Sequence, residues 1–131
     1  MNTQQREIIT KSWMEKADAV LQDARLLSQN GRFASCVNRL YYAVFYSASA
    51  ALASSGQTYG KHSAVRSAVH RDFVNSGLLD KELGRMYDIL LSRREQSDYQ
   101  PLMVFSPEEV ENYLDKAVEM VAAFKGITGK Q

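Results

Sequence analysis

The chain has 131 residues, of which 45% are hydrophobic and 24% are charged, a balance that is typical of one globular domain and excludes disordered and fibrous chains. The formal net charge is +1 at pH 7, so bulk charge does not argue for nucleic-acid binding, and any basic surface must be local. The single cysteine, Cys36, excludes an internal disulfide and fits a reducing compartment.

The N-terminal segment lacks the apolar core of a signal peptide. The most apolar run, Tyr41 to Ala53, contains serines and is too short to span a bilayer. We therefore expect a single domain over residues 1–131, cytoplasmic and without membrane association.

Apolar residues at steps of three and four predict a first helix over about residues 4–29. Asn30-Gly31 ends it, because glycine readily takes the left-handed conformation at a helix end. A second helix is expected over about residues 32–55. Its apolar residues are Phe33, Val37, Leu40, Val44 and Ala51 on one side, and Tyr41, Phe45 and Leu52 on an adjacent side. Such a helix is usually central in a bundle, or divides its faces between the core and a partner.

Two further helices follow a loop that contains glycine. The third covers about residues 62–76 and is closed by Ser76-Gly77. The fourth starts with Asp80 as its N-cap and runs to about Tyr99, shortly before Pro101.

The last predicted helix begins at residues 106–109, Ser-Pro-Glu-Glu. Here Ser106 can cap the helix, proline suits its first position, and Glu109 can complete a capping box. The helix is expected to end at Gly126, and the tail after it to be frayed. The sequence thus predicts an all-α fold, an antiparallel up-and-down bundle of about five helices with short loops.

Charged residues interrupt the apolar stripe of the fourth helix, whose centre is defined by Leu83, Tyr87 and Leu90. On a helical wheel, Arg94 falls roughly 20° and Asp98 roughly 60° from Leu83, so both lie within the stripe. An arginine and a carboxylate four residues apart can meet on one face. Removing an unpaired charge from water costs free energy. Both side chains should therefore be paired, hydrogen-bonded or open to a water-filled cleft.

Two interpretations of these charges are open. In the first, which spacing alone favours, Arg94 and Asp98 form a structural ion pair at the end of the helix. In the second, they line a polar groove between helices or subunits. There the arginine would bind phosphate bidentately, and Asp98 and Tyr99 would orient a hydroxyl or a water.

Three motifs lie in order on the second, third and fourth predicted helices. They are Arg39, Tyr41, Tyr42 and Ala43; Lys61, His62 and Ser63; and Arg94, Asp98 and Tyr99. In these motifs, and over roughly residues 10–125, the chain resembles the HEPN (higher eukaryotes and prokaryotes nucleotide-binding) domain family, in particular its small stand-alone bacterial and archaeal branch.

The resemblance implies an all-α bundle, frequently a homodimer whose fourth-helix motifs face each other across a cleft. Many members of the family are metal-independent ribonucleases with an Arg-x(4–6)-His motif. Others are partners of a minimal nucleotidyltransferase in toxin–antitoxin pairs.

The chain departs from the nuclease pattern. Arg66 and His70 are one residue too close, and Asp98-Tyr99 stands where the motif histidine is expected. A carboxylate, deprotonated at neutral pH, cannot simply take over the acid–base role of an imidazole. Whether the chain is an enzyme therefore stays open at the sequence level.

Other polar residues allow two interpretations each. His62 is either a capping or inter-helix hydrogen-bonding residue or a partner of Arg94 in the cleft. Arg66 and His70 form either a solvated pair or a phosphate contact. Together with Lys61, Arg71 and Arg93 they could form a local basic patch.

The tyrosines Tyr41, Tyr42, Tyr46 and Tyr59 either pack in a core or dimer interface or stack on bases. No metal site and no cofactor are expected, because the chain has one cysteine, no HExxH and no glycine-rich phosphate loop.

The leading hypothesis is an RNA- or nucleotide-associated, HEPN-like homodimer of a toxin–antitoxin or defence system, with a divergent metal-independent ribonuclease as one form of it. Arg94, Asp98 and Tyr99 would form its catalytic set. The residues expected to bind nucleotide or RNA are Arg93, Lys61, His62 and Tyr42. The alternative is a non-catalytic module that binds a nucleotidyltransferase through its second and fourth helices.

Overall fold

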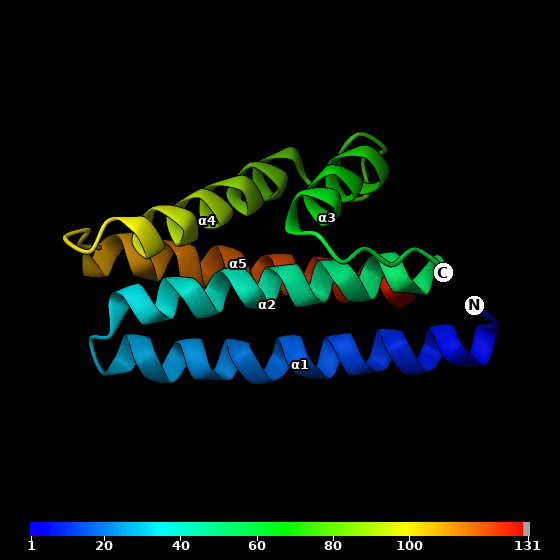
Figure 1. The fold of residues 1–131 in the computed structure, drawn as a ribbon, viewed down its shortest axis with the longest axis horizontal. Coiled ribbons are helices and arrows are strands. Elements are labelled where there is room, and N and C mark those ends of the chain that lie inside the picture. Colours follow the sequence, from blue (N-terminus) through cyan, green and yellow to red (C-terminus); the bar gives the residue numbers. More distant parts are fainter. Residues whose placement is uncertain (130–131) are drawn as a thin grey trace.

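The computed structural model describes residues 1–129, and this part of the chain contains no strand. Its elements are α1 (Thr3–Gln29), α2 (Phe33–Ser54), α3 (His62–Val69), the π-helical turn η1 (His70–Val74), α4 (Lys81–Tyr99) and α5 (Pro107–Gly129). Figure 1 shows α1 and α2 side by side, with α5 behind α2 and α4 on the side of α2 away from α1. The predicted all-α antiparallel bundle is confirmed.

The central helix is α2, which packs against α1, α3, α4 and α5. Its large side chains Leu40 and Tyr41 are fully buried, and so is a run of alanines in its second half. Because these alanines are small, neighbouring helices can approach α2 closely. The central position that the broad apolar surface of the second helix predicts is confirmed.

The C-terminal end of α1 and the N-terminal end of α4 follow the predicted signals. Gly31 closes α1 with a φ of 70°, in the left-handed region that glycine favours. Asp80 caps α4, since its Oδ1 accepts a hydrogen bond of 2.9 Å from the Glu82 amide. Local sequence therefore determines these boundaries.

Helix α5 differs from the prediction at both ends. Ser106 caps it, accepting a hydrogen bond of 3.1 Å from the Glu109 amide, but the Glu109 carboxylate is bound by side chains of α4 and α5 instead of completing a capping box. The expected end at Gly126 is wrong, because the helix continues to Gly129 and buries Ile127 in the core. The expected tail therefore does not begin there; Lys130 and Gln131 lie outside the described residues.

The third predicted helix is divided in two. After α3, the turn η1 has a wider hydrogen-bond pattern, in which the Asn75 amide donates to the His70 carbonyl at 2.9 Å. Such π-helical turns are rare and frequently lie at functional sites. Periodicity does not distinguish this pattern from an ordinary α-helix over so few residues.

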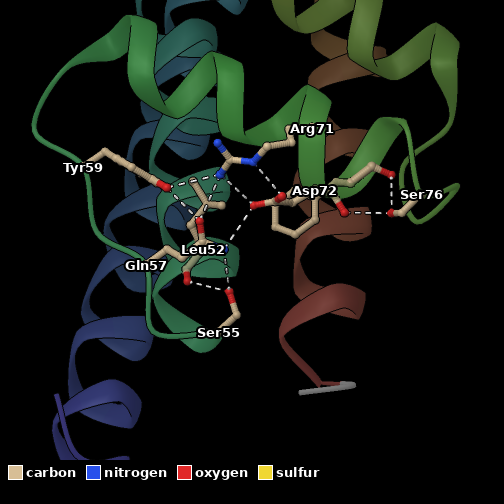
Figure 2. A network of polar contacts seen from close by, with 8 residues as sticks. Leu52, Ser55, Gln57, Tyr59, Arg71, Asp72 and Ser76 are labelled. Carbon is tan, nitrogen blue, oxygen red and sulfur yellow. Dashed lines mark hydrogen bonds and ion pairs between the residues drawn. The ribbon is translucent and has the colours of Figure 1, made fainter.

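A polar network holds the loop between α2 and α3 against η1 (Figure 2). Gln57 donates to the Asp72 carboxylate at 3.1 Å, and Arg71 donates at 3.2 Å to both the Gln57 side chain and the Tyr59 hydroxyl. Arg71 also pairs with Asp72 at 2.9 Å. The network thereby fixes the chain that leads into His62, the first residue of α3.

Within residues 1–129, no helix combines the length and the apolarity that a bilayer span requires.

Candidate functional site

Arg94 lies on the side of α4 that faces α2, as the helical wheel predicts. Its Nη1 donates a hydrogen bond of 2.8 Å to the Tyr42 hydroxyl. The guanidinium carbon lies 5.1 Å from the centroid of the Tyr41 ring and 5.6 Å from that of Tyr42, within the range of cation–π attraction. Its Nε is buried without a hydrogen-bond partner. Two aromatic rings and one hydroxyl therefore contact this cation.

The predicted ion pair between Arg94 and Asp98 is not formed in the described part of the chain. Asp98 is exposed, and Tyr99 is 85% exposed. Both belong to the last turn of α4, at the edge of the bundle, where the helical wheel still counts them as inward. The hydroxyl and rings of two α2 tyrosines take the place of the expected carboxylate beside Arg94.

His62 lies beside the same two tyrosines. Its Nδ1 and the Tyr41 hydroxyl share a hydrogen bond of 2.6 Å. Its ring is stacked on Phe45, with the centroids 4.3 Å apart and the planes at 7°, and it meets the Tyr42 ring edge-on. Tyr41 and Tyr42 thus contact both the imidazole and the guanidinium of Arg94.

The local electrostatics keep this group of side chains in defined protonation states. Burial, and then the Arg94 cation, hold the pKa of His62 below its ordinary value, while Glu95 acts in the opposite direction. Burial also raises the pKa of Tyr41 well above its ordinary value, an effect that Arg94 partly opposes. At neutral pH the imidazole is therefore uncharged, and the tyrosine keeps its proton.

The other predicted binding residues lie elsewhere. Arg93 points to α5, where it pairs with Glu109 at 3.2 Å and donates to the Tyr113 hydroxyl at 3.1 Å. Lys61 is exposed at the N-cap position of α3, next to His62. The structure therefore brings together Arg94, His62 and Tyr42 of the predicted site residues, and it separates Arg93 from them.

A second polar cluster contains a residue that sequence reasoning missed. Asp88 of α4 receives two hydrogen bonds from Arg66 of α3, at 2.7 and 3.1 Å, and its Oδ1 lies 3.0 Å from Nε2 of His70. Burial opposes ionisation, but these hydrogen bonds hold the pKa of Asp88 below its ordinary value. No local spacing joins Asp88 to the other two residues, so only the fold reveals the cluster.

A groove of about 370 Å³ between α3 and α4 connects the two clusters at the surface. His62 and Glu95 line it together with Arg66 and Asp88 of the second cluster. Among residues 1–129, no three His, Cys, Asp or Glu side chains are grouped to hold a metal ion. Burial raises the pKa of Cys36 to about 11, so its thiol stays protonated.

These features define a small all-α bundle with a tyrosine-bound arginine between α2 and α4. The chain belongs to the HEPN domain family, since the family model for the HEPN domain matches residues 10–127. The resemblance of the chain to this family is thereby confirmed.

Individual relatives are similar to the chain over most of their length. A UPF0332 protein of Thermotoga maritima is 42% identical over 113 residues, which cover 86% of each chain. The protein named "Putative toxin MJ0605" of Methanocaldococcus jannaschii is 32% identical over 99 residues, 76% of this chain and 73% of that protein. A second protein of that organism, "Putative toxin MJ0142", is 29% identical over 103 residues, 79% of this chain and 70% of that protein.

Proposed function

We propose that this chain is a toxin-like HEPN module that binds RNA or a nucleotide phosphate at Arg94, in a toxin–antitoxin or defence system. The family membership and the names of the two Methanocaldococcus relatives support the class. The observation that carries the proposal is the state of Arg94. This partly buried cation forms no ion pair with a carboxylate in the described part of the chain.

A phosphate would complete the surroundings of Arg94. Leaving a desolvated cation without a counter-charge costs free energy, and a phosphate group offers several acceptor oxygens together with the missing negative charge. Tyr42 orients the guanidinium through its hydroxyl and through its ring. In this proposal Tyr42 is the positioning residue, and Arg94 contacts the ligand.

The exposed end of α4 supplies the remaining predicted roles. Asp98 and Tyr99 lie one helical turn beyond Arg94, where they can orient a ribose hydroxyl and stack on a base. Lys61 adds an exposed positive charge next to His62. We place these residues at the rim of the site and Arg94 at its centre.

The proposed module acts as a homodimer in which the α4 ends of two copies form one cleft. Exposed large apolar residues follow α4, with Leu102 at 91% and Val104 at 86% exposure, and such clusters mark interaction surfaces. Sedimentation velocity tests the assembly. A monomer that binds RNA with full affinity would contradict it.

The alternative function is a non-catalytic module that binds a nucleotidyltransferase through α2 and α4. The same exposed residues Tyr99, Leu102 and Val104 favour it, because they suit a protein partner as well as a second copy. Co-expression with a minimal nucleotidyltransferase, followed by size-exclusion chromatography, tests this alternative. This alternative function predicts that a stable complex forms. It also predicts that Arg94 makes no contribution to RNA binding.

Fluorescence anisotropy with a labelled single-stranded RNA of mixed sequence tests the proposed function. We expect Arg94→Ala to weaken binding at least about tenfold, because a charge-assisted phosphate contact is lost. Arg85→Ala is the matched control, since it removes an exposed arginine from the same helix. Equal affinities for wild type and Arg94→Ala would exclude Arg94 as the phosphate contact.

A further inference from the structure

The side chain of His62 is held by contacts with two residues of α2. Phe45 covers one face of the ring at a centroid distance of 4.3 Å, and Tyr41 binds Nδ1 at 2.6 Å. Since Nδ1 is occupied, Nε2 is the nitrogen left for a ligand. The residue also lines the surface groove between α3 and α4. An imidazole with one nitrogen fixed and the other available is the usual arrangement of a general base.

His62 and Arg94 lie around the same two rings. The His62 ring centroid is 5.6 Å from that of Tyr41, and the Arg94 guanidinium carbon is 5.1 Å from it. For Tyr42 the corresponding distances are 5.9 and 5.6 Å. Arg94 also lowers the pKa of His62, so its positive charge acts on the imidazole. We therefore expect a phosphodiester bound to Arg94 to lie within reach of the imidazole. His62 would then supply a proton acceptor from α3, since α4 contains no histidine.

We propose that His62 is a catalytic residue of this chain, which accepts a proton from a ribose 2′-hydroxyl while Arg94 binds the adjacent phosphate. This inference rests on the proposed function, because the phosphate must be bound at Arg94. The 2′-oxygen forms a bond to phosphorus, and the bond from phosphorus to the 5′-oxygen breaks. The 2′-proton passes to Nε2, and the leaving 5′-oxygen takes a proton from water. The hydroxide that remains takes the proton from Nε2, which restores the uncharged imidazole. The products carry a 2′,3′-cyclic phosphate and a 5′-hydroxyl.

This role requires one tautomer of His62. Its Nδ1–H must donate to the Tyr41 oxygen, so that Nε2 keeps its lone pair. The charged and titratable groups around the ring are Tyr41 and Tyr42 of α2 and Arg94 and Glu95 of α4. Arg66 of its own helix lines the same groove but is bound to Asp88. Burial and Arg94 favour the uncharged ring, which is the form that accepts a proton.

The other histidine is less suited to this role. Nε2 of His70 lies 3.0 Å from the Asp88 carboxylate, and no contact links His70 to Arg94 or to its two tyrosines in the described residues. His70 therefore serves as the matched control for a substitution of His62.

The experiment measures cleavage and binding of one 5′-labelled single-stranded RNA by wild type, His62→Gln and His70→Gln. Glutamine retains a polar side chain that can bond to Tyr41, but it cannot accept the proton. We expect His62→Gln to lose at least about a hundredfold in kcat with RNA affinity within threefold of wild type. His70→Gln should cleave like wild type.

Four readouts on the wild-type protein do not depend on how a variant folds. A substrate with a 2′-deoxyribose at the cleaved position should remain intact, and the products should carry the cyclic phosphate. The rate should fall with acid as His62 becomes protonated. Nitrogen-15 NMR should show His62 as the Nδ1–H tautomer at neutral pH.

Several results would overturn the inference. Wild type that binds RNA through Arg94 without cleaving it excludes the catalytic role and leaves the proposed function in place. Absence of RNA binding that depends on Arg94 excludes both. Cleavage by His62→Gln at the wild-type rate, or cleavage of the 2′-deoxy substrate, also excludes His62 as the acceptor.

Discussion

Arg93 and Arg94 are neighbours in the chain but have opposite surroundings. Arg93 points to α5, where Glu109 neutralises it and Tyr113 accepts a hydrogen bond. Arg94 points to α2, where it meets two tyrosine rings and one hydroxyl but no carboxylate in the described residues. Arg93 is therefore paired with a carboxylate, whereas Arg94 has no carboxylate partner in the described residues. Position on the helix, and not residue type, separates their roles.

The largest difference in folding stability should follow from removing each arginine in turn. Arg93→Ala should lower the free energy of unfolding by about 1–2 kcal/mol, because it removes a half-buried ion pair and a hydrogen bond. Arg94→Ala should lower the free energy of unfolding by less than about 1 kcal/mol. The loss of the Arg94 contacts is partly offset, because the substitution also removes a buried Nε that has no hydrogen-bond partner.

Urea denaturation followed by circular dichroism measures both changes. Arg85→Ala again controls for loss of an exposed arginine from α4. If Arg94→Ala is the more destabilising of the two, the ordering is reversed and Arg94 is primarily structural.

A smaller effect concerns the pKa of His62. Burial and the Arg94 cation hold this pKa below its ordinary value. Arg94→Ala should therefore raise it, whereas Arg93→Ala, with its charge already paired to Glu109, should leave it unchanged. NMR titration of the His62 ring protons measures the shift. An unchanged pKa in Arg94→Ala would show that the two groups are not coupled.

The same pKa determines a pH dependence of stability. The folded-state pKa of His62 is lower than the unfolded one, so the unfolded chain binds the proton more readily. The contribution to stability is therefore present above the unfolded pKa, about 6.5, and is lost as pH falls through the folded pKa. In Arg94→Ala this loss on acidification should be smaller.

The sequence predicts the fold well because the signals for the helices are local. Apolar steps of three and four residues and the caps at Gly31, Asp80 and Ser106 all appear in the structure. The failures occur where a distant contact decides the outcome. Gly126 is a plausible end of a helix, but the burial of Ile127 extends α5 beyond it.

The candidate site is predictable only in part, for the same reason. A helical wheel correctly turns Arg94 toward α2, since direction is a local property of α4. It cannot show that the last turn of α4 is exposed, so it also turns Asp98 inward, although that residue is exposed. The cluster of Arg66, His70 and Asp88 joins α3 to α4 across the fold, and no spacing within one helix indicates it.

The smallest expected change in stability is that of Asp98→Ala. Asp98 is exposed and forms no ion pair with Arg94 in the described residues, so the free energy of unfolding should stay within about 0.5 kcal/mol of wild type. Its RNA affinity should nevertheless change if the carboxylate orients a ribose hydroxyl at the rim of the site. Thermal melting and anisotropy on the same sample separate the two roles. A clear loss of stability would mean that Asp98 neutralises a buried cation, in which case Arg94 would be paired like Arg93 and the contrast between the two arginines would disappear.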